Sequence, residues 1–343
     1  MQRKSNSVKN DISIVPYRVE QNEEALNIEA LCPQGEEMMV RFIRPTFHKR
    51  SEVYERAIIF SAVCEGKLIG IATGAEKELL LHGETIHAAY GFDLRVHPAF
   101  RKFGTAKRLT DAFKEYFGNK INCNYTYIAG QNKRALAHVR MGVGSRVAIP
   151  MTYFIFPVYK PMIQTMEFTD VSMDELHSLF LKNTPGIDFV PTMKREKMHG
   201  YISSITDGNQ TGTSIWTNEE ILAEQVLRLP TRLSMLRFAQ QLFSPILRLP
   251  NIPKIGETIK SWFLFDLFAK DEHSLRQILA AVNEQALDKG KDFLYVLLYN
   301  NDPLTAMIKQ TGIKYFTIPY IFMANGDHIP GIQDRLYVDI RDL

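Results

Sequence analysis

The same order of strand and helix patterns occurs twice along the 343-residue chain, and this repeat limits the folds available to it. In the second half, a strand pattern at 261–270 is followed by an amphipathic helix pattern at 273–290 and a buried strand pattern at 292–300. In the first half, an alternating strand pattern that ends at Val96 precedes a helix pattern ending at Phe117 and a strand pattern at 125–132. Asn132 leads "KRALAHVRMG" as Asn301 leads "DPLTAMIKQTG", and "AIPMTYFIF" is echoed by "TIPYIFMA". These patterns predict two related α/β folds in tandem.

Two prolines, Pro157 and Pro161, interrupt the pattern between the halves. We therefore expect a first domain over 11–160 and a second over 161–343, after a disordered polar tail at 1–10. Further expected elements are a strand at 11–19, helices at 23–33 and 36–47, a hairpin turning at 65–67, and a strand around 164–171.

The stretch "LRVHPAFRKFGTAKRL", residues 94–109, joins the first strand to the first long helix. It places Arg101, Lys102, Lys107 and Arg108 around Gly104 and contains no acidic residue. A helix start offers backbone N–H groups without partners and favours negative charge, and this one has neither an N-cap acid nor an acid in its first turn. The turn therefore predicts a phosphate site, the alternative being a solvated basic turn. The corresponding stretch of the second half is the short, acidic "DEHS", which would repel phosphate.

The residues Arg101-Lys102-Phe103-Gly104-Thr105-Ala106 resemble the R/Q-x-x-G-x-G/A signature of the GNAT acyltransferases, and Val96-His97-Pro98 resembles the end of that family's fourth strand. The resemblance implies that the amides of 101–106 hold the pyrophosphate of acetyl-CoA or another acyl-CoA, and that the strand residues Leu94, Arg95 and Val96 hold its pantetheine arm. Asn132 and Ala135 match the family's "N-x-x-A", where the Asn contacts the cofactor.

A tandem arrangement with one intact and one degenerate half resembles N-myristoyltransferases and bacterial two-domain acyltransferases. The implied fold class is α/β (α+β), with two GNAT-like domains that each have a mixed, mostly antiparallel central sheet flanked by helices. The implied activity is transfer of an acyl group to a small-molecule or peptide amine by direct attack. The alternative is a non-catalytic acyl-CoA-binding or interaction protein, because Val139 stands where the family commonly has a tyrosine that acts as general acid on the leaving thiolate.

Such a transfer needs a group that takes a proton from the amine and a donor for the departing thiolate. Asp93, in the cofactor strand, is the candidate base; alternatively it only pairs with Arg95 or Arg101. His138 and Tyr127 are candidate acids, and each has a purely structural hydrogen bond as its alternative.

Composition excludes several other classes of protein. A net charge of +3 gives no indication of a nucleic-acid partner, and no run of 18 apolar residues indicates stable membrane insertion. The polar start of the chain has no signal-peptide pattern, so we expect a cytoplasmic protein. Cys32, Cys64 and Cys123 form no C-x-x-C pair, and the histidines show no metal-binding spacing, so no metal is expected. The oligomeric state stays open.

The segment 228–256 has five basic residues, no acid, and Leu233, Leu236, Phe243 and Leu247 at helical spacing. Two interpretations stay open. One is an interfacial helix or a lid over the acceptor site, and the other is a helix packed against the domain junction.

Overall fold

A computed structural model describes residues 11–142, 147–192, 196–243, 250–326, 329 and 335–343. The expected polar tail at 1–10 and Leu247 lie outside these residues. The first half contains the strands β1 Ile12–Pro16, β2 Met39–Ile43, β3 Arg56–Cys64, β4 Lys67–Leu81, β5 Glu84–Val96, β6 Cys123–Ala129 and β7 Val147–Pro157. Its α-helices are α2 Asn22–Ala30, α3 Thr105–Phe117 and α4 Lys133–Gly142.

The second half begins with short strands and ends with long ones. Its strands are β8 Thr169–Val171, β9 Ile187–Asp188, β10 Val190–Pro191, β11 Ile202–Thr206, β12 Thr211–Trp216, β13 Ala223–Arg228, β14 Thr258–Ile259, β15 Ser261–Ala269, β16 Phe293–Tyr299, β17 Phe316–Gly326 and β18 Arg335–Leu336. Its α-helices are α5 Met173–Asn183, α6 Thr231–Phe243, α7 Glu272–Asp288 and α8 Pro303–Gln310.

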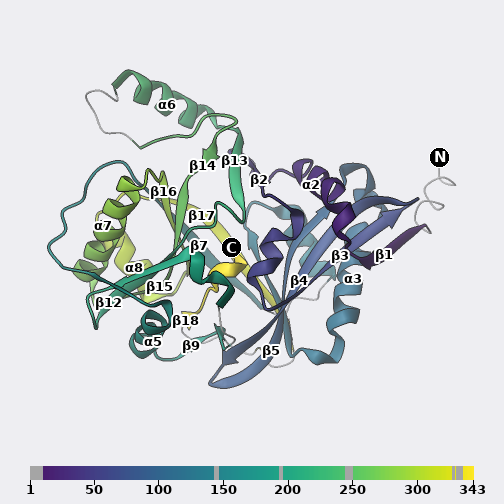
Figure 1. Cartoon of the computed structure of the whole chain (residues 1–343), viewed down its shortest axis with the longest axis horizontal. Helices are drawn as coiled ribbons and strands as arrows, with labels where there is room; N and C mark the ends of the chain where they lie inside the picture. The colour runs from purple at the N-terminus through teal and green to yellow at the C-terminus, as the bar shows by residue number, and fades with distance from the viewer. Residues whose placement is uncertain (1–10, 143–146, 193–195, 244–249, 327–328, 330–334) are drawn as a thin grey trace.

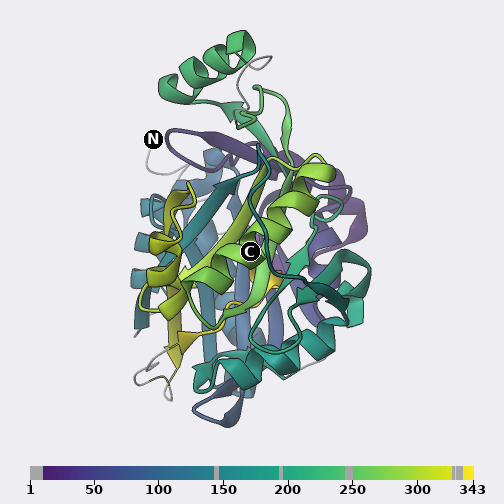
Figure 2. The same cartoon turned by 90° about the vertical axis from the view of Figure 1, so that its left-hand side faces the viewer.

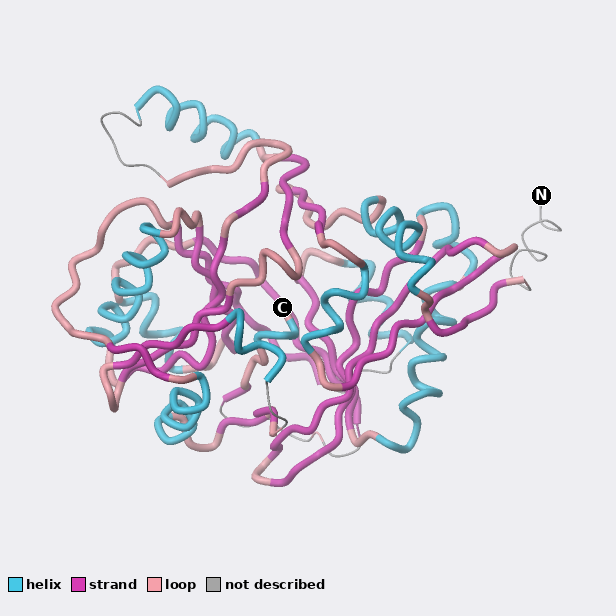
Figure 3. The backbone as a smooth tube through the Cα atoms, viewed as in Figure 1, coloured by secondary structure: helices cyan, strands magenta, loops and turns pink. Residues whose placement is uncertain are grey.

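One large sheet runs through both halves, in the order β1-β3-β4-β5-β6-β17-β7-β16-β15-β12-β11-β8 (Figures 1 and 3). Neighbouring strands are antiparallel except for β5 with β6 and β15 with β16, which are parallel. Helices α2 and α3 pack on opposite faces of the β3–β4 region, because Ile59 and Ile71 face α2 while Phe60 and Ala72 face α3. The mixed, mostly antiparallel sheet flanked by helices confirms the predicted fold class.

The two halves exchange strands at the centre of this sheet. β17, from the end of the chain, pairs with β6 and β7 of the first half. β7, in turn, pairs with β16 of the second half over seven residue pairs from Met151–Tyr299 to Pro157–Phe293. Each half therefore completes its sheet with a strand from the other half.

Both halves carry the same irregularity in the strand before their first long helix. In β5 the register against β4 shifts beside Asp93, and in β15 the register against β12 shifts beside Asp266. Both aspartates have a positive φ, 51° and 47° respectively. The shifts are β-bulges, which bend a strand and redirect the side chains that follow.

The helix expected at 36–47 is wrong. Residues Met39–Ile43 form strand β2, which pairs antiparallel with β13 in a separate three-stranded sheet. Its hydrogen-bonding partner lies about half the chain away, so tertiary pairing overrides the local helical pattern. Likewise, only Thr169–Val171 of the strand expected around 164–171 forms.

Helix α6 stands away from the body of the molecule in both cartoon views (Figures 1 and 2). Leu233 packs against the main core, but Met235, Leu236 and Phe238 are exposed. Among the described side chains of 228–256, Leu229 and Ile252 also pack in the main core, so the interpretation as a segment packed against the junction holds near its two ends. Within the described ranges, no helix combines the length and apolar character needed to cross a membrane.

Candidate functional site

Strands β5 and β6 separate soon after they meet. They pair only from Ala88–Cys123 to Tyr90–Tyr125, and the bulge at Asp93 follows directly on β5. Beyond this point, residues 91–95 of β5 and 126–129 of β6 line the same cavity, which has a volume of about 290 Å³. The cavity continues into the second half, where residues of β13, β14 and β15 line it. The gap between two splayed strands is thus open to both halves.

The basic turn lies beside this gap. Residues Pro98–Phe103 form a 3₁₀-helix, Gly104 follows with φ of 78°, and α3 begins at Thr105. No side chain caps the N-terminus of α3, and a Cβ at Gly104 would meet nothing within 4 Å. Free amides, open space and a favourable helix dipole therefore coincide, as an anion site requires.

The position of α3 depends on a close approach to the sheet. A Cβ at Gly74 of β4 would lie 2.5 Å from the ring of Phe113 and 2.7 Å from that of Phe117. Only glycine lets both aromatic rings of α3 lie this close to β4, so Gly74 helps to set the helix start at the mouth of the gap.

The basic side chains of the turn are only partly committed to the protein itself. Arg101 donates to the carbonyl oxygen of Val96 at 3.2 Å and to the sulfur of Cys32 at 3.3 Å. Lys107 pairs with Asp111 at 2.6 Å, and Arg108 donates to the carbonyl oxygen of Ile12 at 2.7 Å. Lys102 is exposed. Of the remaining turn residues, Thr105 is buried and donates its hydroxyl to the carbonyl oxygen of Phe100 at 3.1 Å, and Phe103 and Ala106 are partly buried.

The corresponding helix of the second half is capped by its own chain. The Asp271 carboxylate accepts hydrogen bonds from the backbone N–H and the hydroxyl of Ser274, both at 2.8 Å. An N-cap carboxylate satisfies one of the free helix amides and places negative charge where a phosphate would bind. This difference between the two helix starts supports the prediction that only the first half keeps a phosphate site.

The gap of the second half is occupied by the chain itself. Leu336 and Tyr337 line a cavity of about 70 Å³ between β15 and β16. The Tyr337 hydroxyl donates to the carboxylate of Asp266 at 2.6 Å, and His177 contacts the same carboxylate at 2.9 Å. The bulge aspartate of this half thus binds internal partners.

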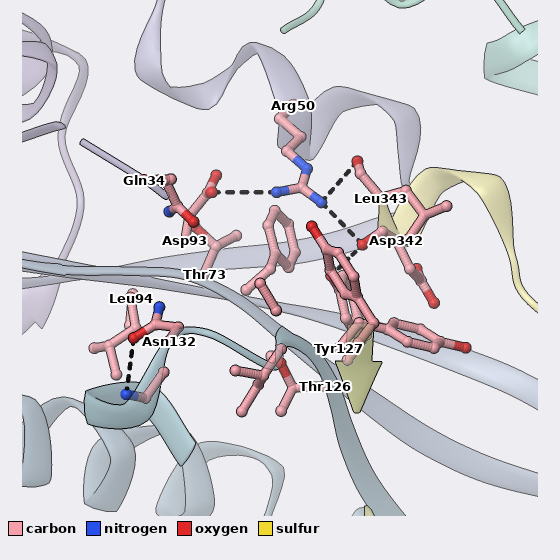
Figure 4. Close-up of a pocket in the computed structure, with 18 of the residues that line it drawn as sticks. Gln34, Arg50, Thr73, Asp93, Leu94, Thr126, Tyr127, Asn132, Asp342 and Leu343 are labelled. Carbon is pink, nitrogen blue, oxygen red and sulfur yellow. Dashed lines mark hydrogen bonds and ion pairs between the residues drawn. The ribbon is translucent and has the colours of Figure 1, made fainter. Parts of the chain in front are cut away.

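Asn132 and Ala135 lie where the sequence predicts, at the start of α4 and in the lining of the large cavity. The Asn132 side-chain oxygen accepts a hydrogen bond from the Ala135 N–H at 3.1 Å, so Asn132 caps α4 (Figure 4). In the second half Asp302, not Asn301, occupies the equivalent cap and accepts from the Leu304 N–H. His138 and Val139 also line the cavity, and His138 lies 2.9 Å from the hydroxyl of Thr110. Burial lowers the pKa of His138, which favours its neutral form.

Tyr127 belongs to a cluster of aromatic rings in tilted and edge-to-face contact. Its ring lies 6.2 Å from Tyr90, 6.1 Å from Tyr125 and 5.3 Å from Phe322, measured between centroids. Burial raises the pKa of Tyr127 well above its usual value, so the phenol stays protonated. Among the described residues, no hydrogen bond of its hydroxyl is observed, and the side chain lines the cavity.

Asp93 is buried and held by arginines. Its carboxylate accepts from Arg44 at 2.8 Å and from Arg50 at 3.2 Å, and Arg95 lies 3.8 Å away. Burial opposes ionisation, but these guanidinium groups prevail and lower the pKa of Asp93. Of the two partners expected from the sequence, Arg95 is near, whereas Arg101 contacts Val96 and Cys32.

Arg50 connects Asp93 to the end of the described chain. It donates to the backbone oxygens of Asp342 and Leu343 at 3.1 and 3.0 Å, on the side away from Asp93 (Figure 4). The Asp342 carboxylate is bound by Lys77 and accepts from the Tyr125 hydroxyl at 2.8 Å. Tyr54 and Tyr90 donate to backbone oxygens of the same segment. Sequence reasoning missed Arg50, Lys77 and Asp342, since nothing local in the sequence indicates that residues about 290 apart meet here.

The chain was compared with known proteins. Residues 22–143 match the model of the "Acetyltransferase (GNAT) family". A search of curated proteins finds no match. Among solved structures, a Saccharomyces cerevisiae N-myristoyltransferase with bound myristoyl-CoA superposes with a TM-score of 0.60 at 11% identity, covering 92% of this chain and 82% of that chain.

Two further structures are similar. A glucosamine N-acetyltransferase region of a fungal multi-domain β-N-acetylglucosaminidase gives a TM-score of 0.57 at 14% identity, covering 92% of this chain and 38% of that chain. A GCN5-related N-acetyltransferase from Kribbella flavida gives a TM-score of 0.52 at 11% identity, covering 91% of this chain and 70% of that chain. The likeness in fold thus spans both halves, and the family match covers the gap and the basic turn. Residues 22–143 of this chain form a domain of the GNAT acetyltransferase family.

Proposed function

We propose that this protein is an N-acyltransferase that moves an acyl group from acetyl-CoA or another acyl-CoA to an amine. The observation that carries the proposal is the uncapped, basic start of α3 beside the gap between β5 and β6. This gap opens into a cavity that reaches the second half, so that a cofactor and an acceptor have room to meet. Bringing two reactants together in one cavity is itself a large part of the catalysis of a group transfer.

The residues present fit an acyl-CoA. In the proposed arrangement, the amides of residues 101–106 bind its phosphates, with charge supplied by Arg101 and Lys102. The backbone of residues 94–96, unpaired on its β6 side, offers hydrogen bonds to the amide groups of its pantetheine arm. The acyl-CoA supplies an activated acyl group next to the bulge at Asp93.

For Asp93 we propose a positioning role in place of the predicted general-base role. Because its pKa is lowered by Arg44 and Arg50, the carboxylate is a poor proton acceptor. It fixes Arg50, and Arg50 in turn fixes the backbone at Asp342 and Leu343 beside the cavity. Proton removal from the amine is left to a water path through the cavity.

For the group that donates to the departing thiolate, we propose Tyr127 ahead of His138. Tyr127 is protonated and its hydroxyl is not committed to a described neighbour, whereas His138 is held against Thr110 and is favoured as the neutral form. This assignment supplies a phenol from β6 where the family commonly has one on α4.

The test is release of free thiol from acetyl-CoA in the presence of a panel of amines and peptides. We expect turnover with at least one amine class, and a lower kcat with an unchanged acetyl-CoA Kd for Tyr127→Phe, because the substitution removes only the hydroxyl. The alternative, a non-catalytic acyl-CoA-binding protein, is favoured by Val139. It would be supported by tight acetyl-CoA binding without turnover across the panel.

A further inference from the structure

An unpaired carboxylate faces the large cavity from the second half. Glu224 lies in β13, opposite Phe42 of β2 and Ile259 of β14, and its side chain lines the cavity. Among the described residues, no hydrogen bond or ion pair of this side chain is observed. Burial raises the pKa of Glu224 to about 7, and no neighbouring cation offsets this effect. A carboxylate in this setting lacks the partner that buried charges normally have.

Three tyrosines stand on the sheet beneath it. Tyr153 of β7 lies between Tyr295 of β16 and Tyr320 of β17, with centroid distances of 5.2 and 5.4 Å and tilted ring planes. Glu224, Tyr153 and Tyr320 line the same cavity, and Tyr295 lies behind them against Tyr153. Burial raises the pKa of all three phenols, and the charge of Glu224 adds to this increase. We call Glu224 and these three tyrosines the tyrosine box.

Of three charged side chains in this region, two are paired elsewhere, and the third, Arg95, keeps an Nε without a hydrogen-bond partner among the described residues. Lys291 pairs with Glu219 at 2.6 Å, and Arg41 donates to Gln225 at 2.7 Å. Arg95 lies over the ring of Phe42, 5.6 Å from its centroid, and faces Asp93. No cation of the described chain lowers the pKa of Glu224, although the charge of Arg50 acts on Tyr320, so the box presents a carboxylate without a counter-ion beside electron-rich rings. This combination attracts an ammonium group, through the carboxylate and through cation–π contacts.

The box lies apart from the proposed reaction centre. In the sheet order, β7 is two strands from β6, so Tyr153 lies roughly 10 Å from the edge of the cofactor gap at about 4.8 Å per strand. One amine at the gap and an ammonium group at the box therefore require an acceptor with two separated nitrogens.

We propose that the tyrosine box binds a second, non-reacting ammonium group of the acceptor, so that the preferred acceptors are diamines or polyamines. This inference rests on the proposed function for the identity of the reacting site. The binding of a dication to the box does not require turnover and is tested separately.

The experiment is isothermal titration of the full chain with 1,8-diaminooctane and with 1-aminooctane at pH 8, without acyl-CoA. We expect the diamine to bind at least about tenfold more tightly than the monoamine, and Glu224→Gln to remove this preference. Tyr153→Leu should weaken diamine binding several-fold, because the substitution removes one aromatic ring face. The matched control is Glu220→Gln, an exposed carboxylate four residues away, which should behave as the unmodified protein.

Equal affinity for the two amines in the unmodified protein, or an unchanged diamine preference in a folded Glu224→Gln, would overturn the inference. Thiol release with the same two amines decides the proposed function independently. Diamine-selective binding without any transfer would refute acyl transfer to these amines and leave the box as a dication site.

Discussion

Asp93 and Asp266 occupy equivalent positions in the two halves of the molecule. Each stands between a phenylalanine and a leucine, at a β-bulge, with φ near +50°. Their partners differ, because Arg44 and Arg50 hold Asp93, whereas Tyr337 and His177 contact Asp266. The same β-bulge thus lies beside an open gap in one half and contacts the chain's own side chains in the other.

The phosphate site predicts a specific loss of acetyl-CoA binding. Gly104→Glu should abolish the rise in melting temperature that acetyl-CoA gives the unmodified protein, because a carboxylate then occupies the anion site. Gly83→Glu is the matched control: its φ of 82° and open surroundings resemble those of Gly104, but it lies in the β4–β5 turn. Both variants carry similar backbone strain, about 1–2 kcal/mol. If acetyl-CoA still raises the melting temperature of Gly104→Glu, the assignment of the phosphate site to residues 101–106 is wrong.

The capped helix start of the second half predicts how many acetyl-CoA molecules bind to each chain. Acetyl-CoA should bind with one equivalent per chain in isothermal titration, because the start of α7 is capped by Asp271. Asp271→Ala should lower the melting temperature through the lost helix cap and leave acetyl-CoA affinity unchanged. The double substitution Arg101→Ala and Lys102→Ala should weaken that affinity. Two equivalents per chain would show that the second half also binds the cofactor.

The ion pairs of Asp93 predict a large loss of stability. Asp93→Asn leaves two buried arginines short of their counter-ion and should reduce the free energy of unfolding by about 3–5 kcal/mol. Asp111→Asn, which breaks the exposed pair with Lys107, should cost about 1 kcal/mol or less. Denaturant titration measures both changes, and equal effects would contradict the role given to Asp93.

The same carboxylate predicts an acid dependence. The pKa of Asp93 is lowered in the folded state, so its contribution to stability is complete above the unfolded pKa of about 4 and is lost as the pH falls below it. The stability difference between the unmodified protein and Asp93→Asn should therefore shrink on acidification. Thermal unfolding measured from pH 6 downward gives this difference directly.

The pH dependence of stability that we expect from Glu224 has the opposite sign to that of Asp93. Its folded-state pKa of about 7 lies above that of an unfolded glutamate, so the carboxylate destabilises the fold as the pH rises through 4.5 to 7. Glu224→Gln should raise the melting temperature at pH 8 and have little effect at pH 4, unlike Glu220→Gln. Tyr153, Tyr295 and Tyr320 stay neutral over this range because burial raises each pKa. A pH-independent effect of Glu224→Gln would contradict this explanation.

Local patterns in the sequence predicted most of the elements around the gap. The alternation that ends at Val96, the helix through Leu109 and Phe113, and the uncapped turn at Gly104 all reflect short-range physical rules, and all occur in the structure. What the sequence could not indicate depends on distant partners. The strand at Met39–Ile43 forms because β13 pairs with it. The role of Arg50 depends on its contact with Asp342, which only the tertiary fold brings beside it.

Glu224 was missed for a related reason. In "AEQVLR" it is one of several polar residues of a strand, and a polar residue of a strand normally lies on the solvated face. Only the tertiary fold places it in the same cavity as Tyr153 of β7 and Tyr320 of β17.

The exchange of β7 and β17 has a consequence for any attempt to express the two halves separately. A fragment that ends before β8 keeps β6 and β7 but lacks β17, which pairs with both of them, so two strand edges would lose their partner. A fragment that begins at β8 keeps β16 without β7, its neighbour in the sheet. Neither half therefore completes its sheet alone.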